Sequence, residues 1–301
     1  MHDVPTSLSA WADRGRWIDV GGREIFVVDL GPAQAERTLV LLHGFPTSSH
    51  DFHEVIDRLA EHTRVVAHDH LGFGLSAKPH EYSYSLIEQA EQALGLWRKL
   101  GIQHAHLLAH DYGTSVATEL LARIHIDLAG GFELDSLVLC NGSVHIELAD
   151  LTLSQRVLEA PPAIAQLFAR LSSRRFFDQR IQGLLGPDSE LPESELRAMW
   201  EGIEHHEGRL LLPTISHYLD ERRRYWHRWI GALERCHVPT LVLWGRRDPV
   251  AVAAIAEQLA GEIPGAKLHW LERLGHFPML EDPQGWSDPV IRWLDEQSQS
   301  R

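Results

Sequence analysis

The chain has 301 residues, of which 44% are apolar and 23% are charged, and its formal net charge is −14. This length allows one large α/β domain with an insertion, or two small domains. The acidic balance argues against binding of nucleic acid, because proteins that hold a phosphate backbone neutralise it with Lys and Arg. No basic segment followed by an apolar run opens the chain, and no apolar stretch reaches about 18 residues. We therefore expect a cytoplasmic protein without a transmembrane segment.

Short apolar runs rich in Val and Leu recur along the chain and predict strands. They span residues 24–29, 38–42, 64–68, 106–109, 136–140, 240–244 and 267–271. Helical patterns lie between several of these runs, at residues 85–100 and 115–124, and a last helix is expected at about 283–297. Strands that alternate with helices indicate the α/β class, with a mostly parallel twisted sheet and helices on both faces.

Residues 146–229 interrupt this alternation of strands and helices. The interval is helix-like, contains Pro161-Pro162, and offers no clear strand. We expect it to be a helical cap inserted between two parts of an α/β core, residues 1–145 and 230–301. Its basic clusters, Arg174-Arg175 and Arg222-Arg223-Arg224, are expected to lie on solvated helix faces.

The segment 109–113, with the sequence AHDYG, follows a predicted strand and precedes a predicted helix. This is the context of a nucleophile elbow, in which small residues two positions before and after the central residue let strand and helix pass closely. The central residue is Asp111 where most elbows have serine. The alternative is that Asp111 only caps the helix.

An aspartate nucleophile has different chemistry from a serine. Its carboxylate is ionised at neutral pH without help, and it can displace a leaving group from a saturated carbon to form an ester. A histidine is then free to activate the water that hydrolyses this ester. Asp111 therefore points to cleavage of a C–O or C–halogen bond in two steps.

The loop 41–47, LLHGFPT, follows a predicted strand and should help to form an oxyanion hole. In such a site one backbone N–H comes from this loop and one from the residue after the nucleophile. We assign these donors to Phe45 and Tyr112. The peptide bond between Phe45 and Pro46 is a candidate for the cis form, and His43 is expected to hold the shape of the loop.

Two downstream residues complete a candidate triad. Asp248, in GRRDP, lies just beyond a predicted strand, and His276, in GHFP, lies in the loop after the next strand. Asp248 could accept the Nδ1 hydrogen of His276, which would fix the tautomer of the imidazole. Glu147 is the other carboxylate considered for this position. The site should lie at the carboxyl ends of the strands, beneath the cap.

Neither thiols nor metal ligands form a recognisable motif. Cys140 and Cys236 are too few for a disulfide framework and are expected to be inert. His68-Asp69-His70 and His205-His206 could supply ligands, but no HExxH or CxxC spacing accompanies them. We expect no metal and no cofactor.

With HGFP, AHDYG, GRRDP and GHFP identified, the sequence resembles the α/β-hydrolase superfamily branch that contains epoxide hydrolases and haloalkane dehalogenases. The resemblance extends over roughly residues 17–295. Within the branch, segments such as LLAHDYGTSVATELLAR and RRYWHRWIGAL are most similar to the mesoderm-specific transcript protein group. The resemblance implies the α/β-hydrolase fold and, as the most favoured activity, hydrolysis of an epoxide to a diol.

Epoxide hydrolases use one or two cap tyrosines to stabilise the oxygen of the opening ring. Tyr218, in the segment ISHYL, resembles the later of these tyrosines, whereas residues 146–200 contain no tyrosine to match the earlier one. His145, Gln155 and Trp200 are the donors considered in its place. The candidate substrate-binding residues are accordingly Tyr218, His43, Pro46 and Trp200.

Three other interpretations of the sequence stay open at this stage, two of them enzymatic and one noncatalytic. Haloalkane dehalogenases place halide-binding donors where this chain has Tyr112 and Phe45, and the ring of Phe45 cannot donate a hydrogen bond. A strained lactone could be opened by the same nucleophile. A noncatalytic small-molecule receptor could use the same scaffold. The expected partners are a small apolar organic substrate and water, and self-association into a homo-oligomer is left open.

Overall fold

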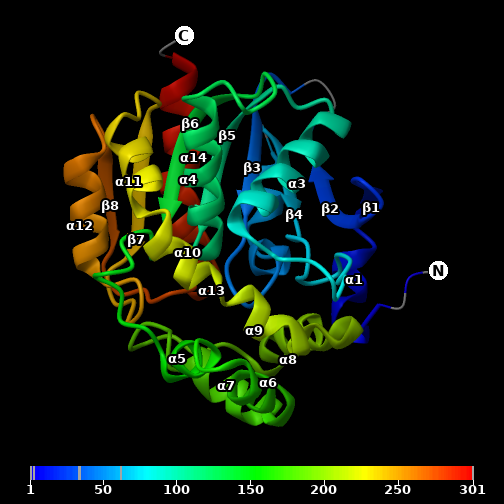
Figure 1. Cartoon of the computed structure of the whole chain (residues 1–301). Helices are drawn as coiled ribbons and strands as arrows, with labels where there is room; N and C mark the ends of the chain where they lie inside the picture. Colours follow the sequence, from blue (N-terminus) through cyan, green and yellow to red (C-terminus); the bar gives the residue numbers. More distant parts are fainter. Residues whose placement is uncertain (1, 3, 33–34, 62, 300–301) are drawn as a thin grey trace.

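The computed structural model of the chain describes residues 2, 4–32, 35–61 and 63–299. Its centre is an eight-stranded sheet with the order β1-β2-β4-β3-β5-β6-β7-β8 (Figure 1). The strands are β1 Gly15–Asp19, β2 Glu24–Leu30, β3 Thr38–Leu42, β4 Arg64–His68, β5 His104–His110, β6 Glu133–Cys140, β7 Thr240–Gly245 and β8 Lys267–Leu271. Every run of residues that predicted a strand belongs to this sheet.

The sheet is parallel from β4 to β8, and its first two strands are antiparallel additions at one edge. Strand β1 was not predicted. It lies at the edge and none of its residues is fully buried, so it lacks the apolar run by which the other strands were recognised.

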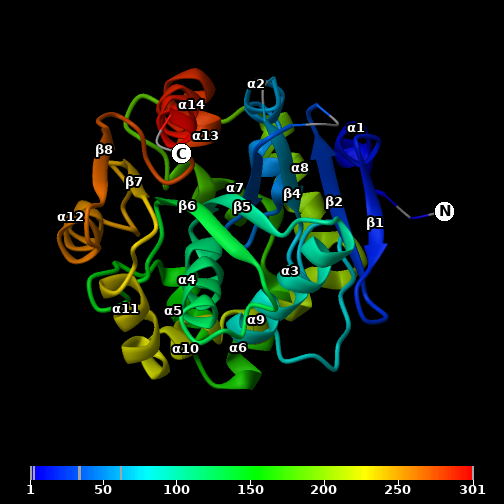
Figure 2. The same ribbon diagram turned by 90° about the horizontal axis from the view of Figure 1, so that it is seen from above.

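Helices cover both faces of the sheet (Figure 2). On one face lie α3 (Leu86–Lys99), α4 (Tyr112–Ile124), α11 (Trp226–Glu234) and α12 (Ala253–Glu262), and on the other lie α2 (Ile56–Leu59) and α14 (Pro283–Gln299). Two buried apolar clusters correspond to these two layers, because successive side chains of each strand point to opposite faces. The predicted α/β fold with a mostly parallel sheet and helices on both faces is confirmed.

Most of a helical segment between β6 and β7 lies apart from the sheet, at the lower end of the molecule in Figure 1. It comprises α5 (Leu153–Leu158), α6 (Pro162–Leu171), α7 (Arg174–Gln182), α8 (Glu193–Glu204), η3 (His205–Leu211), α9 (Leu212–Ile215) and α10 (Tyr218–Arg224). We propose that residues 146–229 act as a cap on the core formed by residues 1–145 and 230–301. Helix α11 crosses the proposed boundary at residue 229 and packs against α4.

Three short helices complete the fold: η1 (Thr6–Leu8), α1 (Ser9–Ala12) and α13 (Pro278–Glu281), with the 3-10 turn η2 (Ser49–Phe52) after β3. Within the described part of the chain, no helix combines the length and the apolar character needed to cross a bilayer.

Candidate active site

Asp111 stands in a sharp turn between β5 and α4, with φ 44° and ψ −109°. This left-handed conformation is strained for a residue with a side chain. The turn also requires close approach of its neighbours: a Cβ on Gly113 would lie 2.6 Å from the carbonyl oxygen of Leu42, and one on Gly44 would lie 3.0 Å from the Cβ of Asp111. Glycine at these two positions lets the loop after β3 and the start of α4 meet around the carboxylate.

One oxygen of the Asp111 carboxylate is held by the loop after β3. The backbone N–H of Phe45 donates to Oδ2 of Asp111 at 2.9 Å, and the Phe45–Pro46 peptide bond is cis, as predicted. Tyr112 is the first residue of α4, so its N–H has no partner within the helix. These are the two donors assigned to the oxyanion hole, and Phe45 already binds the nucleophile's own oxygen.

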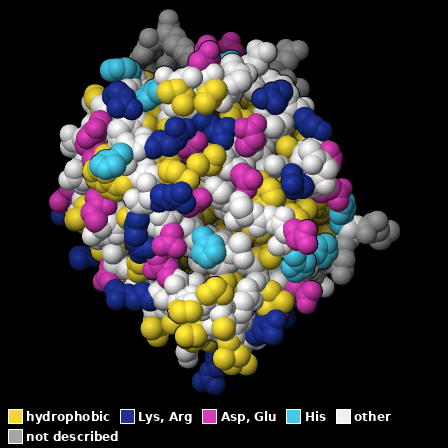
Figure 3. Space-filling model, viewed as in Figure 1, with side chains coloured by type: hydrophobic (Ala, Val, Ile, Leu, Met, Phe, Trp, Pro, Cys, Tyr) yellow, Lys and Arg dark blue, Asp and Glu magenta, His cyan; other side chains and the backbone are white. Residues whose placement is uncertain are grey.

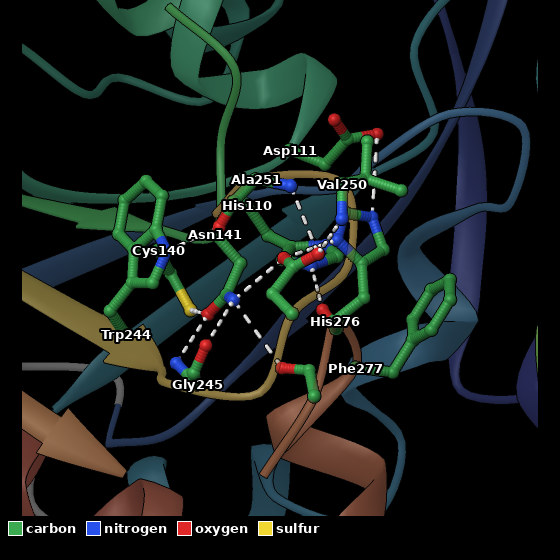
Figure 4. A network of polar contacts seen from close by, with 12 residues as sticks. His110, Asp111, Cys140, Asn141, Trp244, Gly245, Val250, Ala251, His276 and Phe277 are labelled. Atoms are coloured by element: carbon green, nitrogen blue, oxygen red, sulfur yellow. Dashed lines mark hydrogen bonds and ion pairs between the residues drawn. The ribbon is translucent and has the colours of Figure 1, made fainter. Parts of the chain in front are cut away.

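His276 lies between Asp248 and Asp111, and Figure 4 shows it beside Asp111. The Nδ1–H of His276 donates to Oδ2 of Asp248 at 2.7 Å. The other ring nitrogen, Nε2, lies 4.0 Å from Oδ2 of Asp111, which is too long for a hydrogen bond. All three side chains are at least 96% buried. The imidazole is therefore oriented by one carboxylate and faces the other without being bonded to it.

Asn141 also holds Asp248, although it was not among the residues predicted from the sequence. Its Nδ2 donates to Oδ2 of Asp248 at 2.8 Å, while its Oδ1 accepts the N–H of Gly245 at 2.9 Å. The other carboxylate oxygen of Asp248 accepts the N–H groups of Val250 and Ala251 at 2.7 and 2.9 Å. Asn141 follows β6 directly and has a positive φ of 44°. The pair Asn141-Gly142 after a buried strand was the available signal.

The pKa values of the pair shift in opposite directions. Burial alone would raise the pKa of Asp248, but the charge of His276 and the bonds from His276 and Asn141 hold it below its ordinary value. Burial alone would lower the pKa of His276, but the carboxylates of Asp248 and Asp111 raise it to about 9. At neutral pH the histidine is therefore an imidazolium between two anions.

His110, the residue before the nucleophile, anchors the loop that carries His276. Its ring Nε2–H donates to the backbone carbonyl of His276 at 2.7 Å. Burial and the nearby charge of His276 lower the pKa of His110 to about 4, so it is neutral at pH 7. The sequence did not single out this histidine, because a histidine within a buried strand carries no pattern of its own.

His43 was a candidate for the substrate cavity, and the structure corrects this. It is fully buried, its Nε2 accepts the N–H of His70 at 2.9 Å, and its Nδ1–H donates to the carbonyl of Gly44 at 2.8 Å. Burial lowers the pKa of His43 to about 4. Both ring nitrogens are therefore used to hold the loop.

Arg222 departs from the expectation that its basic cluster is solvated. Its side chain is buried, 1% exposed, and its Nε–H donates to Oγ of Ser115 at 2.8 Å. The guanidinium also lies 4.6 Å from the ring centre of Tyr218. Helix α10 thus turns one arginine inward, beneath the start of α4, while Arg223 and Arg224 are exposed. Charge pattern alone could not show which of three adjacent arginines faces the core.

A cavity of about 110 Å³ connects the triad to the helical segment. Asp111 and His276 lie on its wall, together with Pro46, Trp200 and Gln155. Most of the remaining wall is apolar and comes from Phe45, Leu158, Phe168, Phe176, Phe177, Ile181, Leu184, Ile203, Leu212 and Val250. Pro46 and Trp200 therefore occupy positions consistent with the substrate contacts expected of them.

Tyr218 lies behind this wall. It is 1% exposed, and the Nε2–H of Gln155 donates to its hydroxyl oxygen at 3.3 Å. The ring packs against Phe45 and Tyr112, with centroids 5.4 and 5.1 Å away. Burial and the charge of Asp111 raise the pKa of Tyr218, so its hydroxyl is protonated. Of the three donors considered in place of the missing tyrosine, Gln155 is the one that contacts Tyr218.

Among the described residues, one group of three has ligand atoms all within 4.8 Å of one another, namely His50, His53 and Glu195. The sequence had suggested other histidines. Nδ1 of His50 and Nε2 of His53 lie 3.3 and 3.4 Å from the carboxylate of Glu195. Because Glu195 belongs to α8, these contacts join the helical segment to the turn after β3.

Both cysteines are buried and form no disulfide, and burial raises the pKa of Cys140 to about 12.

The chain is similar to known proteins in both sequence and fold. A family model described as alpha/beta hydrolase fold matches residues 37–283. The mesoderm-specific transcript homolog protein of Homo sapiens is 35% identical over 98% of this chain and 91% of its own length. LipZ, a proposed hydrolase of Mycobacterium tuberculosis, is 39% identical over 96% of this chain and 98% of its own length. The haloalkane dehalogenase DbeA of Bradyrhizobium elkani superposes with a TM-score of 0.81 at 22% identity, over 95% and 99% of the two chains.

Proposed function

Because the chain belongs to the α/β-hydrolase fold family, as the family model and the relatives show, we propose that it is a hydrolase that converts an apolar epoxide to a diol through a covalent ester at Asp111. The arrangement of the Asp111 carboxylate supports this proposal most directly. Oδ2 is bound by the N–H of Phe45, and the carboxylate lies on the wall of an apolar cavity beside His276. A bound Oδ2 leaves Oδ1 as the oxygen that attacks.

In the first step, Oδ1 of Asp111 attacks a ring carbon of the epoxide and the C–O bond of the ring breaks. The electron pair moves to the ring oxygen, which takes the hydroxyl proton of Tyr218. This leaves a phenolate at Tyr218. A proton that His276 loses through water restores the phenol, because esterification removes the negative charge that lies 4.0 Å from the Nε2 of His276. The pKa of His276, raised to about 9 in part by Asp111, then falls and the imidazole becomes a base.

In the second step, Nε2 of His276 takes a proton from water, and the hydroxide attacks Cγ of Asp111. The negative charge of the tetrahedral intermediate forms on Oδ2, where Phe45 and Tyr112 supply backbone N–H groups. Collapse of the intermediate breaks the bond between Cγ and Oδ1. The departing oxygen takes the proton of the new carboxyl group, so the diol leaves and Asp111 is again a carboxylate. Asp248 stabilises the imidazolium that results.

Gln155 sets the direction of the Tyr218 proton. Its Oε1 accepts the backbone N–H of Thr152 at 2.8 Å, within a capping box at the start of α5. A backbone N–H can only donate, so this contact fixes which end of the amide is oxygen. Nε2–H then donates to the oxygen of Tyr218. The phenol hydrogen is therefore free for another acceptor. In the proposed reaction this is the epoxide oxygen, which must reach Tyr218 between Phe45 and Gln155 of the cavity wall.

Tyr218→Phe should lower the rate of ester formation from an epoxide by roughly 10- to 10³-fold, the range for loss of one preorganised donor. The phenol stabilises charge that appears only as the ring opens, so hydrolysis of the ester should be unchanged. Stopped-flow tryptophan fluorescence would measure the two steps separately. An unchanged alkylation rate would remove Tyr218 from the mechanism, and halide release from haloalkanes by the wild type would favour dehalogenation instead.

Gln155→Met should reduce the alkylation rate by a smaller factor, roughly 3- to 10-fold, because the phenol remains but loses the partner that orients it. The double variant with Tyr218→Phe should be no slower than Tyr218→Phe alone. Additive losses in this double-mutant cycle would mean that Gln155 acts independently of Tyr218.

A further inference from the structure

Exposed apolar side chains gather on the helical segment. Seven large apolar residues are exposed within the described part of the chain, and five of them lie in or just before α5 and α6. These five, which we call the cap apolar surface, are Leu148, Leu153, Ile164, Leu167 and Leu171. Contiguous exposed apolar side chains of this size mark sites that contact a protein, a membrane or a ligand.

Helix α6 presents its apolar residues outward by a regular pattern. Ile164, Leu167 and Leu171 are separated by three and four positions, so they share one face, and they are 54%, 57% and 73% exposed. Ala165 and Ala169 on the opposite face are buried. The helix therefore packs through its alanines and leaves Ile164, Leu167 and Leu171 exposed to water.

The α6 part of the cap apolar surface adjoins the active-site cavity. Ile164, Leu167 and Leu171 line an outer groove of about 440 Å³. This groove shares Phe168, Ser172 and Phe176 with the cavity that contains Asp111. An apolar molecule bound at the surface can thus reach the nucleophile along an apolar wall.

The stretch from α5 to α7 is basic although the whole chain is acidic. Residues 153–182 carry five arginines and two carboxylates, Glu159 and Asp178, a net charge of +3 in a chain of net charge −14. Arg170, Arg175 and Arg180 are exposed. Figure 3 shows Lys and Arg side chains around hydrophobic ones at the lower end of the molecule, where Figure 1 places these helices. Apolar side chains with a basic rim are suited to an anionic lipid surface.

We propose that α5 to α7 dock on the surface of an anionic lipid bilayer and that apolar substrate passes from the bilayer into the cavity through the outer groove. The docking surface is inferred from the exposed apolar side chains and the arginines around them. The delivery of substrate, by contrast, rests on the proposed function. Leu167 and Leu171 enter the acyl region in this arrangement, and Arg170 and Arg175 lie at the level of the headgroups.

Sedimentation of the full chain with vesicles tests the docking surface. Binding should occur with a mixture of phosphatidylcholine and phosphatidylglycerol, be weaker with phosphatidylcholine alone, and weaken as salt is added. Leu167→Gln with Leu171→Gln should lower the partition coefficient by about 10-fold or more. Arg175→Gln should lower it about 5-fold on the mixed vesicles only.

The matched control is Ile126→Gln with Leu128→Gln. These residues are 53% and 61% exposed and follow α4, which runs from Asp111 back toward the amino ends of the parallel strands β5 and β6. This control should bind vesicles like the wild type. Equal losses in the two double variants, or no vesicle binding by the wild type, would overturn the proposal. A wild-type dimer that Leu167→Gln with Leu171→Gln dissociates, without vesicle binding, would assign the surface to a second copy of the chain.

Vesicle binding is measured without substrate, so its outcome is independent of the epoxide assignment. If binding holds and no epoxide is turned over, the docking surface stands and the proposed reaction fails. If a water-soluble epoxide is hydrolysed and the protein does not bind vesicles, the proposed reaction stands and the docking surface fails. Neither leucine lines the cavity that contains Asp111, so Leu167→Gln with Leu171→Gln should hydrolyse a water-soluble epoxide at the wild-type rate.

Discussion

His276→Gln should form the ester at Asp111 and then stop. Alkylation requires only the carboxylate and a proton donor, but hydrolysis requires a base to deprotonate water, and glutamine cannot accept that proton. Loss of a general base costs roughly 10²- to 10⁴-fold, and we expect the upper part of this range because the cavity wall offers no second imidazole among the described residues. Intact-mass measurement after exposure to a panel of epoxides should show the protein heavier by the mass of one epoxide.

The position of the ester can be verified in the wild type. In a single turnover in ¹⁸O-labelled water, the label should enter the carboxylate of Asp111, because hydroxide attacks Cγ and not the substrate carbon. Asp111→Asn is the matched control and should gain no mass from any epoxide. Label found only in the diol would contradict the ester route, and a mass increase in Asp111→Asn would place the nucleophile elsewhere.

The sequence predicted the residues that are defined by a local pattern. Asp111, Asp248 and His276 each follow a predicted strand in a recognisable short motif, and they lie beyond the carboxyl ends of β5, β7 and β8. The apolar strands were predicted for the same reason, since a strand buried on both faces is a continuous apolar run. The edge strand β1 has no such run and was missed.

The residues that were missed act through contacts between distant segments. Asn141 reaches Asp248 over 107 positions, and His110 reaches the carbonyl of His276 over 166. Arg222 turns inward because Ser115 and the ring of Tyr218 receive it there. No periodicity marks such pairs, because each partner alone has an ordinary interpretation as a turn, strand or surface residue. The contact between Gln155 and Tyr218 depends equally on a fold that joins α5 to α10.

Asp248→Asn should retain the fold and slow hydrolysis of the ester by about 10⁴-fold, the loss seen when the orienting aspartate of a similar triad is replaced. An asparagine can turn its amide N–H toward His276, and the imidazole would then carry its proton on Nε2, where it cannot accept one from water. Single-turnover decay of the ester would measure the effect. Glu147→Gln is the matched control, because Glu147 was the other carboxylate considered and pairs with His145 instead, at 2.7 Å. It should hydrolyse the ester like the wild type.

The same variant should change how stability depends on pH. The pKa of His276 is raised from 6.5 to about 9 in the folded protein, so its stabilising contribution is fully present below about pH 6.5 and is lost as the pH rises through 9. Without the anion at Asp248, the folded-state pKa falls and this contribution largely disappears. Denaturant unfolding between pH 6.5 and 9 should therefore show a smaller decline in the free energy of unfolding for Asp248→Asn than for the wild type. An identical decline in both proteins, together with unchanged ester hydrolysis, would mean that another group supports the imidazolium. Glu281 also raises the pKa of His276, so it would be the next residue to replace.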